Sequence, residues 1–305
     1  MTGPYLYEAF GLRIRSEFAL PELFECDRAG CEVEIVRASL EETWRRSAAR
    51  DDIFVMQGAN VLFRIPEVGL FSAEGGRTLR VCPLPGGDEE RLRLYILGTG
   101  MGLILLQRRT LPLHGSCVEI GGKAYVIVGH SGTGKSTLSS VLLSRGYRLL
   151  SDDVIPIVFS GQTPVAVPSY PQQKLWQDSM NELGMTRRDG RPIYNRETKF
   201  AVPAHDYFQR ESLPLAGVFE LVKAKGEPFI APIPVLERYY VLFHHTYRNF
   251  YVTRAGLMDW HFGTLARFVN RIGVYRIGRS TTAFSAHESA DRMLEAIDQG
   301  VNRDE

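Results

Sequence analysis

The sequence carries almost no net charge, and this limits what the protein can bind by charge alone. Lysine and arginine number 36 and aspartate and glutamate number 35, which leaves a formal net charge of +1. Without a positive excess, no long-range attraction draws the chain to nucleic acid or to an anionic membrane surface. We therefore expect no nucleic-acid partner and no membrane partner, and any anionic ligand must be held by a local cluster of side chains.

Cysteine is also scarce. The four cysteines are Cys26, Cys31, Cys82 and Cys117, and no two of them form the Cys-x-x-Cys pair typical of zinc sites. We expect free thiols in a reducing compartment and hence a cytoplasmic protein. The first residues lack the basic and apolar segments of a secretory signal, and the longest apolar run is too short to cross a bilayer.

What the sequence does contain is a complete phosphate-binding loop. Residues 129–136 read Gly-His-Ser-Gly-Thr-Gly-Lys-Ser, which matches the pattern GxxxxGK[ST]. The glycines let backbone N–H groups turn toward phosphate oxygens, Lys135 supplies a cation, and the Ser136 hydroxyl can bind Mg²⁺. The residues expected to hold ATP are Gly129, Ser131, Gly132, Thr133, Gly134, Lys135, Ser136 and Thr137.

The residues on both sides of the loop predict the strand and the helix that this motif requires. Residues 123–128 form an apolar, largely β-branched run that leads into the loop. Residues 137–145 have helical spacing, and Gly146 is a candidate for ending the helix. The sequence therefore predicts the strand, loop and helix that a phosphate-binding motif requires.

The pattern of glycine, proline and asparagine predicts two parts with a boundary near residue 88. Residues 1–88 read as a smaller, β-rich N-terminal domain and a candidate for recognising a substrate or partner, with one helical segment at 40–46. Residues 89–305 read as an α/β domain that begins with a helical pattern at 91–109. Strands in the N-terminal part are predicted at 9–14, 32–36, 53–56, 61–65 and 78–81.

The strands next to the loop carry acidic side chains and a histidine. Residues 113–120 are joined to the strand at 123–128 by two glycines, which predicts a hairpin. The predicted strand at 147–155 contains Asp152 and Asp153. Because successive side chains of a strand face opposite sides, both can serve one site only if the strand ends and turns there. One carboxylate is expected near Mg²⁺ and one near an acceptor hydroxyl, and the spacing leaves open which is which.

These segments resemble the catalytic core of the HPr kinase/phosphorylase family. The resemblance rests on Leu-His-Gly-Ser at 113–116, on the loop at 129–137, and on Arg-Gly-Tyr-Arg-Leu-Leu-Ser-Asp-Asp at 145–153. It implies a P-loop domain with a mixed sheet and a phosphoenolpyruvate-carboxykinase-like fold. It also implies an oligomer built from copies of the chain.

The resemblance also implies roles for individual residues. In that family the histidine of the preceding strand and the second aspartate of the pair form the acid/base couple, which corresponds to His114 and Asp153. Together with Lys135 they are the expected catalytic residues. Asp152 and Ser136 are then placed nearer to the metal ion.

Two departures from the family narrow the expected activity. HPr kinases usually have glutamate directly after the loop, where this chain has Thr137, and this weighs against reversible phosphorylase chemistry. The segments 7–12 and 16–23 resemble instead the HPr-kinase-like proteins found with lasso-peptide biosynthesis. That resemblance implies an ATP-dependent kinase that phosphorylates the C-terminal serine of a precursor peptide.

A basic segment at 187–199 follows a predicted helix at 172–183. Within it, Arg196 and Lys199 are candidates to neutralise charge in the transition state. A solvated cluster of charges is the alternative. The adjacent histidines His244 and His245 have no ligand partners at recognisable spacing and are expected to be structural.

Other activities share the same motifs. A kinase acting on a free, serine-like small molecule would use every one of these catalytic residues with a different acceptor pocket. An ATP-binding regulatory module would bind Mg²⁺ without phosphoryl transfer. A switch or motor NTPase is disfavoured by the short interval between Lys135 and Asp153.

Overall fold

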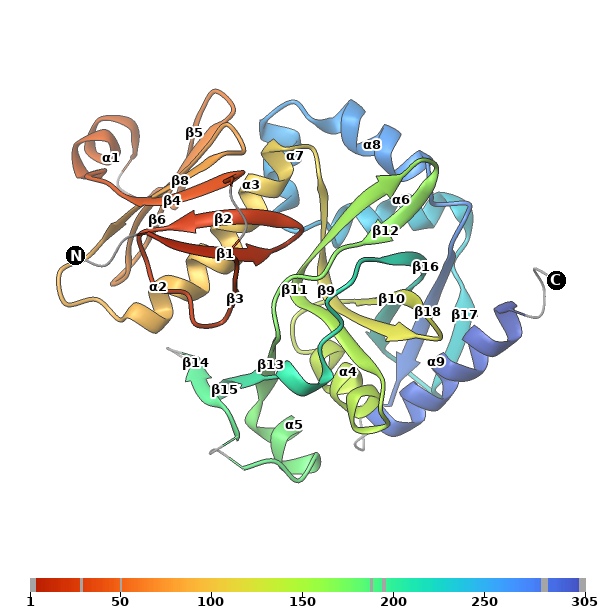
Figure 1. The fold of residues 1–305 in the computed structure, drawn as a ribbon. Helices are drawn as coiled ribbons and strands as arrows, with labels where there is room; N and C mark the ends of the chain where they lie inside the picture. The colour runs from red at the N-terminus through yellow and green to blue at the C-terminus, as the bar shows by residue number, and fades with distance from the viewer. Residues whose placement is uncertain are drawn as a thin grey trace. The chain divides into compact units, whose positions relative to one another are not determined.

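The computed structural model describes residues 4–27, 30–49, 51–186, 189–193, 196–280 and 285–301. The chain divides into two compact units (Figure 1). The first unit comprises Met1–Pro112 and Tyr247–His261, and the second comprises Leu113–Thr246 and Phe262–Glu305. Each unit has its own sheet and core, so each is described by itself.

The first unit is built on an eight-stranded sheet in the order β3-β1-β2-β4-β8-β7-β6-β5. Its strands are β1 (Tyr5–Ala9), β2 (Leu12–Ser16), β3 (Phe24–Glu25), β4 (Val33–Arg37), β5 (Phe54–Gln57), β6 (Asn60–Ile65), β7 (Gly69–Glu74) and β8 (Thr78–Pro83). Its helices are α1 (Glu41–Ser47), α2 (Glu89–Tyr95), the π-helical η1 (Ile96–Gly100), α3 (Met101–Gln107) and α7 (Asn249–Arg254). The β-rich N-terminal part and the short helix after residue 40 are therefore as predicted.

One predicted strand in this unit is wrong. Residues 9–14 do not form one strand: they comprise the last residue of β1, a turn at 10–11 and the start of β2, which pairs with β1 in antiparallel register. Phe10 and Gly11 in this turn have positive φ of 59° and 69°, which a continuous strand does not allow. The alternation of apolar and polar residues continues across the turn, because buried residues lie both before and after it. The sequence pattern therefore looked like one strand.

The units also divide at a different place from the predicted boundary near residue 88. Helix α3 packs against β7 and β8 of the first unit, and its last residue, Gln107, bonds three backbone groups there. The Gln107 amide nitrogen donates to the carbonyl oxygens of Ala59 and Ala73 at 2.9 and 2.8 Å, and its oxygen accepts from the Gly76 N–H at 2.8 Å. Residues 89–112 therefore belong with the N-terminal sheet.

The second unit has a seven-stranded mixed sheet in the order β10-β9-β11-β12-β16-β18-β17 and a separate sheet in the order β13-β15-β14. A further pairing between β10 and β16 closes the first five strands into a ring. The strands are β9 (Leu111–Ile120), β10 (Lys123–Val128), β11 (Arg148–Ser160), β12 (Thr163–Ala166), β13 (Gln172–Trp176), β14 (Arg191–Ile193), β15 (Arg196–Pro203), β16 (Leu213–Lys223), β17 (Phe229–Pro232) and β18 (Gly273–Arg279). The helices are α4 (Lys135–Ser144), α5 (Gln177–Glu182), the 3₁₀ turn η3 (His205–Tyr207), α6 (Val235–His244), α8 (Met258–Ala266), which begins in the first unit, and α9 (Ala286–Val301).

The hairpin that leads into the loop is as predicted. Strands β9 and β10 pair in antiparallel register up to Ile120 and Lys123, and the two glycines between them have φ of 58° and 74°. Positive φ at both positions is the signature of the tight turn that joins two twisted strands. Strand β10 is apolar because it is buried in the centre of the sheet, between β9 and β16.

Helix α4 lies beside α9 against this sheet (Figure 1). It contacts β10 and β11 as well as α9, and its residues from Thr137 to Leu143 are buried. The helix that starts at the loop is thus held firmly on the sheet, so its N-terminus has a fixed position.

The predicted helix at 172–183 is only half correct. Residues Gln172–Trp176 form strand β13, and helix α5 follows at Gln177–Glu182. Strand β13 pairs with β15 from Gln172 to Trp176, a partner more than twenty residues away along the chain. This distant pairing overrides the local helical pattern.

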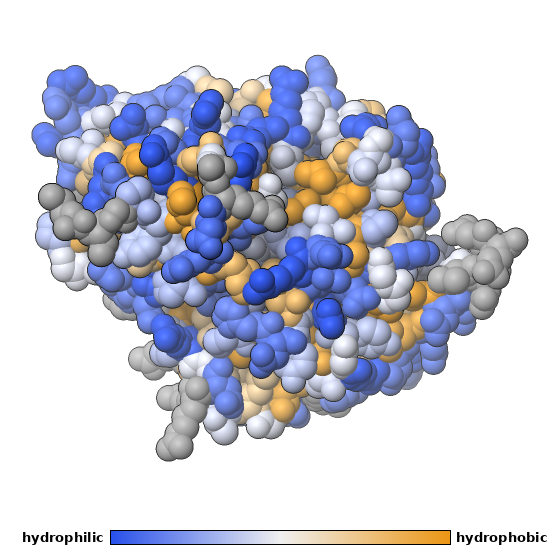
Figure 2. All heavy atoms as spheres, in the orientation of Figure 1, coloured by the Kyte–Doolittle hydropathy of each residue, from blue (hydrophilic) through white to orange (hydrophobic). Residues whose placement is uncertain are grey.

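On the face shown in Figure 2, hydrophilic residues predominate and smaller hydrophobic patches lie between them. In the described parts of the chain, no helix combines the length and the hydropathy needed to span a bilayer.

Gly115, next to His114 on β9, has no room for a side chain. A Cβ atom there would lie 2.1 Å from the carbonyl oxygen of Ile127 on β10. We expect Gly115→Ala to lower the free energy of unfolding by about 1–3 kcal/mol, the usual cost of overpacking, as measured by urea denaturation. Gly226→Ala is the matched control, because a Cβ at Gly226 meets open space. Equal stability of the two variants would contradict the close approach.

Candidate active site

The phosphate-binding loop connects strand β10 to helix α4. Gly129, Gly132 and Gly134 have φ of 148°, 79° and 101°, a backbone conformation that residues with a Cβ rarely adopt. A Cβ at Gly129 would also lie 2.5 Å from the carbonyl oxygen of Leu221 on β16. The loop ends at the N-terminus of α4, where unpaired N–H groups and the helix dipole favour an anion.

Lys135 is held at the mouth of the loop. Its Nζ donates to the carbonyl oxygens of Gly129 and His130 at 2.9 and 3.1 Å. Burial lowers the pKa of the Lys135 ammonium, the Asp152 carboxylate opposes this shift, and the Lys199 ammonium adds to it. The Asp152 carboxylate thus balances the positive charge of the Lys135 ammonium only in part. A bound phosphate would supply further negative charge.

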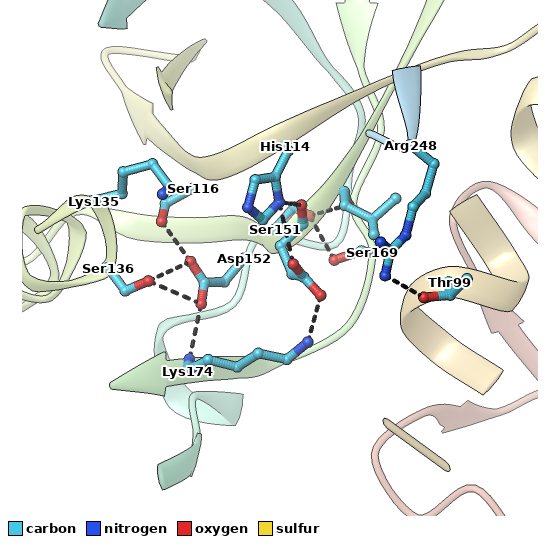
Figure 3. A network of polar contacts seen from close by, with 12 residues as sticks. Thr99, His114, Ser116, Lys135, Ser136, Ser151, Asp152, Ser169, Lys174 and Arg248 are labelled. Atoms are coloured by element: carbon cyan, nitrogen blue, oxygen red, sulfur yellow. Dashed lines mark hydrogen bonds and ion pairs between the residues drawn. The ribbon is translucent and has the colours of Figure 1, made fainter. Parts of the chain in front are cut away.

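Asp152 lies between three segments of the second unit (Figure 3). Its carboxylate accepts hydrogen bonds from Ser116 Oγ on β9 and, at 3.1 Å, from Ser136 Oγ on α4. The backbone N–H of Lys174 on β13 donates to the second carboxylate oxygen at 2.8 Å. The carboxylate is therefore directed toward the loop hydroxyl.

This pair of oxygen donors suits Mg²⁺. Magnesium is usually held by one or two protein oxygens, and substrate phosphates and water complete its octahedron. Asp152 and Ser136 offer such a partial shell. In the described residues there is no cluster of three or more histidine, cysteine, aspartate or glutamate side chains that could hold a metal on its own.

Asp153 reaches the same site through an unusual backbone. Strand β11 does not end at the aspartates but continues to Ser160. Instead, Asp153 has φ of 92°, which interrupts the alternation of sides and lets both carboxylates line one cavity with the loop. The strand therefore does not end at the aspartates, as the sequence led us to expect. A positive φ at Asp153 brings both carboxylates to one side, and aspartate tolerates this conformation better than most residues.

The Asp153 carboxylate is held between two basic side chains. His114 Nδ1 lies 3.2 Å from Oδ1 and 3.0 Å from the Asp153 carbonyl oxygen, and Lys174 Nζ lies 2.5 Å from Oδ2. Burial by itself would raise the pKa of the Asp153 carboxyl, but the Lys174 ammonium and the His114 imidazole outweigh it and hold that pKa well below its usual range. Asp153 is therefore ionised at neutral pH and able to accept a proton or a hydrogen bond.

Lys174 is the main site residue that the sequence did not indicate. Its side chain is 9% exposed, and it lies in the segment predicted to be a helix. A single lysine in an otherwise buried strand pattern, Gln-Gln-Lys-Leu-Trp, is the signal that could have marked it, because buried lysine needs a partner. Ser116 was likewise part of the motif but had no assigned role.

Most of the predicted residues meet in one cavity. Its lining includes, from the predicted set, His114, Ser131, Gly132, Gly134, Lys135, Ser136, Thr137, Asp152, Asp153 and Lys199. Gly129 and Thr133 are not part of that lining. Thr133 instead bonds within the loop, donating from Oγ1 to the His130 carbonyl oxygen at 2.8 Å.

The two residues predicted to neutralise charge, Lys199 and Arg196, both belong to strand β15. Lys199 lines the cavity, and its Nζ lies 5.5 Å from the ring centre of Trp176, a cation–π distance. Arg196 begins strand β15, and its side chain lies outside the described residues. Thr137, which replaces the usual glutamate, shares a 2.7 Å hydrogen bond with Ser179 of α5.

The histidines near the loop pack against one another. The His130 ring lies 4.9 Å from the His244 ring and 5.8 Å from the His245 ring. His245 Nε2 lies 3.4 Å from Glu220, and the His245 carbonyl oxygen accepts from the His114 N–H at 2.7 Å. These contacts support the strand that carries His114.

Comparison with known proteins matches this region of the chain. The profile of the HPr Serine kinase C-terminal domain matches residues 106–175, a segment that runs from the end of α3 into β13. The HPr kinase/phosphorylase of Paraburkholderia phymatum is 37% identical over 97 residues, which cover 32% of this chain and 28% of the relative. The putative HPr kinase/phosphorylase 2 of Oceanobacillus iheyensis is 43% identical over 102 residues, covering 32% and 33%.

The likeness is confined to part of each protein, since the chain spans no more than about a third of the length of these two relatives. Among solved structures, that of the Hpr(Ser) kinase/phosphatase from Coxiella burnetii aligns with a TM-score of 0.36 and 14% identity, covering 63% of this chain and 94% of the other. The segment matched by the family profile contains His114, the phosphate-binding loop and both aspartates of the site. Over this segment, the chain is similar to the HPr kinase/phosphorylase family.

Proposed function

We propose that this protein is an ATP- and Mg²⁺-dependent kinase that phosphorylates a serine hydroxyl, and that its acceptor is the C-terminal serine of a lasso-peptide precursor. The observation that carries the first part is the position of Asp153. This ionised carboxylate, fixed by His114 and Lys174, lines the same cavity as the phosphate-binding loop. A nucleotide site alone would not need a second, charge-balanced carboxylate at that place.

The reaction follows from the arrangement. The loop amides and Lys135 hold the β- and γ-phosphates, and the acceptor hydroxyl donates a hydrogen bond to Asp153. The serine oxygen forms a bond to the γ-phosphorus while the bond between that phosphorus and the β,γ-bridging oxygen breaks. The electron pair of the broken bond stays on the bridging oxygen, which leaves as part of ADP. The serine proton passes to Asp153 and then to solvent.

His114 and Lys174 keep Asp153 in position for this step. His114 contacts both the carboxylate and the backbone of Asp153, so it fixes the direction in which the free lone pairs point. Mg²⁺, held by Ser136 and Asp152 together with the phosphates, would neutralise charge on the phosphate oxygens. Positioning and charge neutralisation are what phosphoryl transfer chiefly requires from a protein.

The finer part of the proposal rests on the N-terminal unit and on Thr137. Segments 7–12 and 16–23 resemble HPr-kinase-like proteins of lasso-peptide biosynthesis, and the first unit that contains them is a separate compact body available for recognising a peptide. Thr137 bonds to Ser179 and puts no carboxylate beside the metal position. We accordingly propose a forward kinase in the cytoplasm, with no phosphorylase activity.

A labelling experiment with [γ-³²P]ATP tests this function. The purified protein is incubated with Mg²⁺ and, separately, a precursor peptide ending in serine, the same peptide ending in alanine, free serine, the protein HPr, or buffer alone. We expect label on the serine-terminated peptide only. Label on free serine would indicate a small-molecule kinase, label on HPr would indicate the activity named for the relatives, and phosphate release without acceptor would indicate an NTPase. The absence of transfer together with tight ATP binding would favour a regulatory module.

A further inference from the structure

A wide groove lies beside the sheet of the first unit. Strands β2 and β4, the segment that follows β2, and the loop between β8 and α2 contribute to its lining. Its volume is about 1170 Å³, above the range of about 300–1,000 Å³ that is usual for sites of small molecules. We propose that this groove binds an extended segment of the acceptor peptide upstream of its terminal serine, an assignment that rests on the function proposed above.

The catalytic cavity is much smaller than the groove. Its volume is about 60 Å³, so it can contact only the reacting end of a peptide. A terminal serine is common to many peptides, and selection of one of them needs a second contact on the same chain. Two contacts made by one peptide reinforce each other, because the second forms at a high effective concentration.

One wall of the groove is the loop between β8 and α2. The Gly87 N–H donates to the Leu84 carbonyl oxygen at 3.0 Å, and Gly86 has φ of 73°. With Pro85 before that glycine, these are the features of a type II turn. The Leu84 N–H is bonded to the Val68 carbonyl oxygen at 2.9 Å. The turn therefore fixes Leu84, whose side chain is exposed and lines the groove, where it can pack against an apolar side chain of a peptide.

A second wall carries a cation in a fixed position. The Arg37 guanidinium lies 4.3 Å from the centre of the Phe18 ring, a cation–π contact, and Phe18 is buried, with its N–H bonded to Ser16 Oγ at 3.0 Å. The Glu17 carboxylate accepts from the backbone N–H of Arg37 at 2.7 Å. Among the described residues the Arg37 guanidinium forms no ion pair. Its planar N–H groups can therefore bind a carboxylate of a ligand.

The other two arginines of the lining already have carboxylate partners. Arg15 pairs with Glu34, and Arg93 Nε lies 2.8 Å from Glu22. The lining also contains acidic side chains, so the groove has no positive excess that would favour a polyanion such as nucleic acid. This balance suits a peptide segment that presents a single acidic side chain to Arg37 beside an apolar one.

The test measures binding of two labelled probes to the full-length protein by fluorescence anisotropy. One probe is the serine-terminated precursor peptide, and the other is the same peptide shortened to its last few residues. Arg37→Glu is expected to raise the Kd for the full peptide about tenfold, a usual contribution of a hydrogen bond to a charged group, and to leave the Kd for the shortened peptide unchanged.

A second groove variant and a control accompany Arg37→Glu. Leu84→Asp should also weaken the full peptide alone, because it removes the apolar contact and repels an acidic segment, while aspartate is favoured at the first position of a turn. Arg45→Glu, at an exposed position on α1 outside the groove lining, is the matched control and should bind both probes as the wild type does. A precursor peptide whose acidic residues are replaced by lysine should bind Arg37→Glu more tightly than it binds the wild type.

The outcomes separate the groove from the kinase activity. The groove site would be overturned, and the kinase proposal left standing, if the wild type bound the full and shortened peptides equally or if both groove variants bound the full peptide as the wild type does. An equal loss of affinity in Arg45→Glu, or no gain from the lysine-substituted peptide, would also overturn it. Binding that depends on Arg37 without any transfer of phosphate would reject the kinase proposal and leave the groove as a peptide site.

Discussion

Asp153→Asn is expected to lower the rate of phosphoryl transfer by about 10²- to 10⁴-fold, the usual contribution of a general base, while ATP binds with nearly unchanged affinity. The amide keeps the size of the carboxylate, and asparagine also tolerates the positive φ of 92° at this position. It still offers an oxygen to Lys174, so the site keeps its shape and loses only the proton acceptor. Single-turnover kinetics measure the chemical step, and calorimetry measures ATP binding.

Asp152→Asn is the matched comparison, because the neighbouring carboxylate has a different environment. Asp152 bonds Ser116, Ser136 and the Lys174 N–H, so its replacement should raise the Mg²⁺ concentration needed for half-maximal activity. Asp153→Asn should leave that concentration unchanged. Full activity of Asp153→Asn, or a Mg²⁺ effect at Asp153 and none at Asp152, would reverse the assigned roles.

Lys174→Met is expected to lower the free energy of unfolding by about 3–5 kcal/mol near neutral pH, since it removes the ammonium of a buried ion pair and leaves the Asp153 carboxylate with His114 alone. Methionine retains most of the apolar length of the lysine side chain, so little packing is lost. Unfolding in urea is the measurement. Lys123→Met, at an exposed position on β10, is the control and should be nearly neutral.

The pH dependence of this loss has a definite sign. In the wild type the pKa of Asp153 is lowered on folding, so its stabilisation is full above the unfolded value of about 3.9 and disappears as the pH falls through the folded value. Without the Lys174 ammonium, burial opposes only His114, and the pKa of Asp153 rises. The difference in stability between wild type and Lys174→Met should therefore shrink as the pH falls, and the acid limb of kcat/KM should move to higher pH.

A double variant isolates the interaction between Lys174 and Asp153 from their other contacts. Adding Asp153→Asn to Lys174→Met removes the buried charge that the single variant leaves unpaired, so much of the lost stability should return, a non-additive result. Strict additivity of the two substitutions would show that the two side chains do not interact. A second result would also contradict the ion pair: a difference in stability between wild type and Lys174→Met that does not change with pH.

Much of the second unit was predictable because the signals were local. The hairpin between β9 and β10 depends on two adjacent glycines, and the loop with its following helix is a contiguous motif in which each residue acts on its neighbours. Short-range patterns of this kind survive folding because tertiary contacts reinforce them.

The errors arose where distant segments decided the structure. Residues 172–176 became a strand through pairing with β15, and residues 89–112 joined the N-terminal sheet through the bonds of Gln107. Propensity within a short window has no information about such partners. The same limit hid Lys174, whose role depends on the position of β13 beside Asp153.

The sequence by itself determined that a phosphate-binding loop lies between a strand and a helix, with a histidine before it and two aspartates after it. Only the tertiary structure decided that both aspartates line one cavity, because a single left-handed residue at Asp153 overrides the alternation of a strand. Only it brought the Lys174 ammonium to that carboxylate. The physical reason is that a pKa depends on which charges are near in space, and residues 153 and 174 become neighbours only when β11 and β13 pack together.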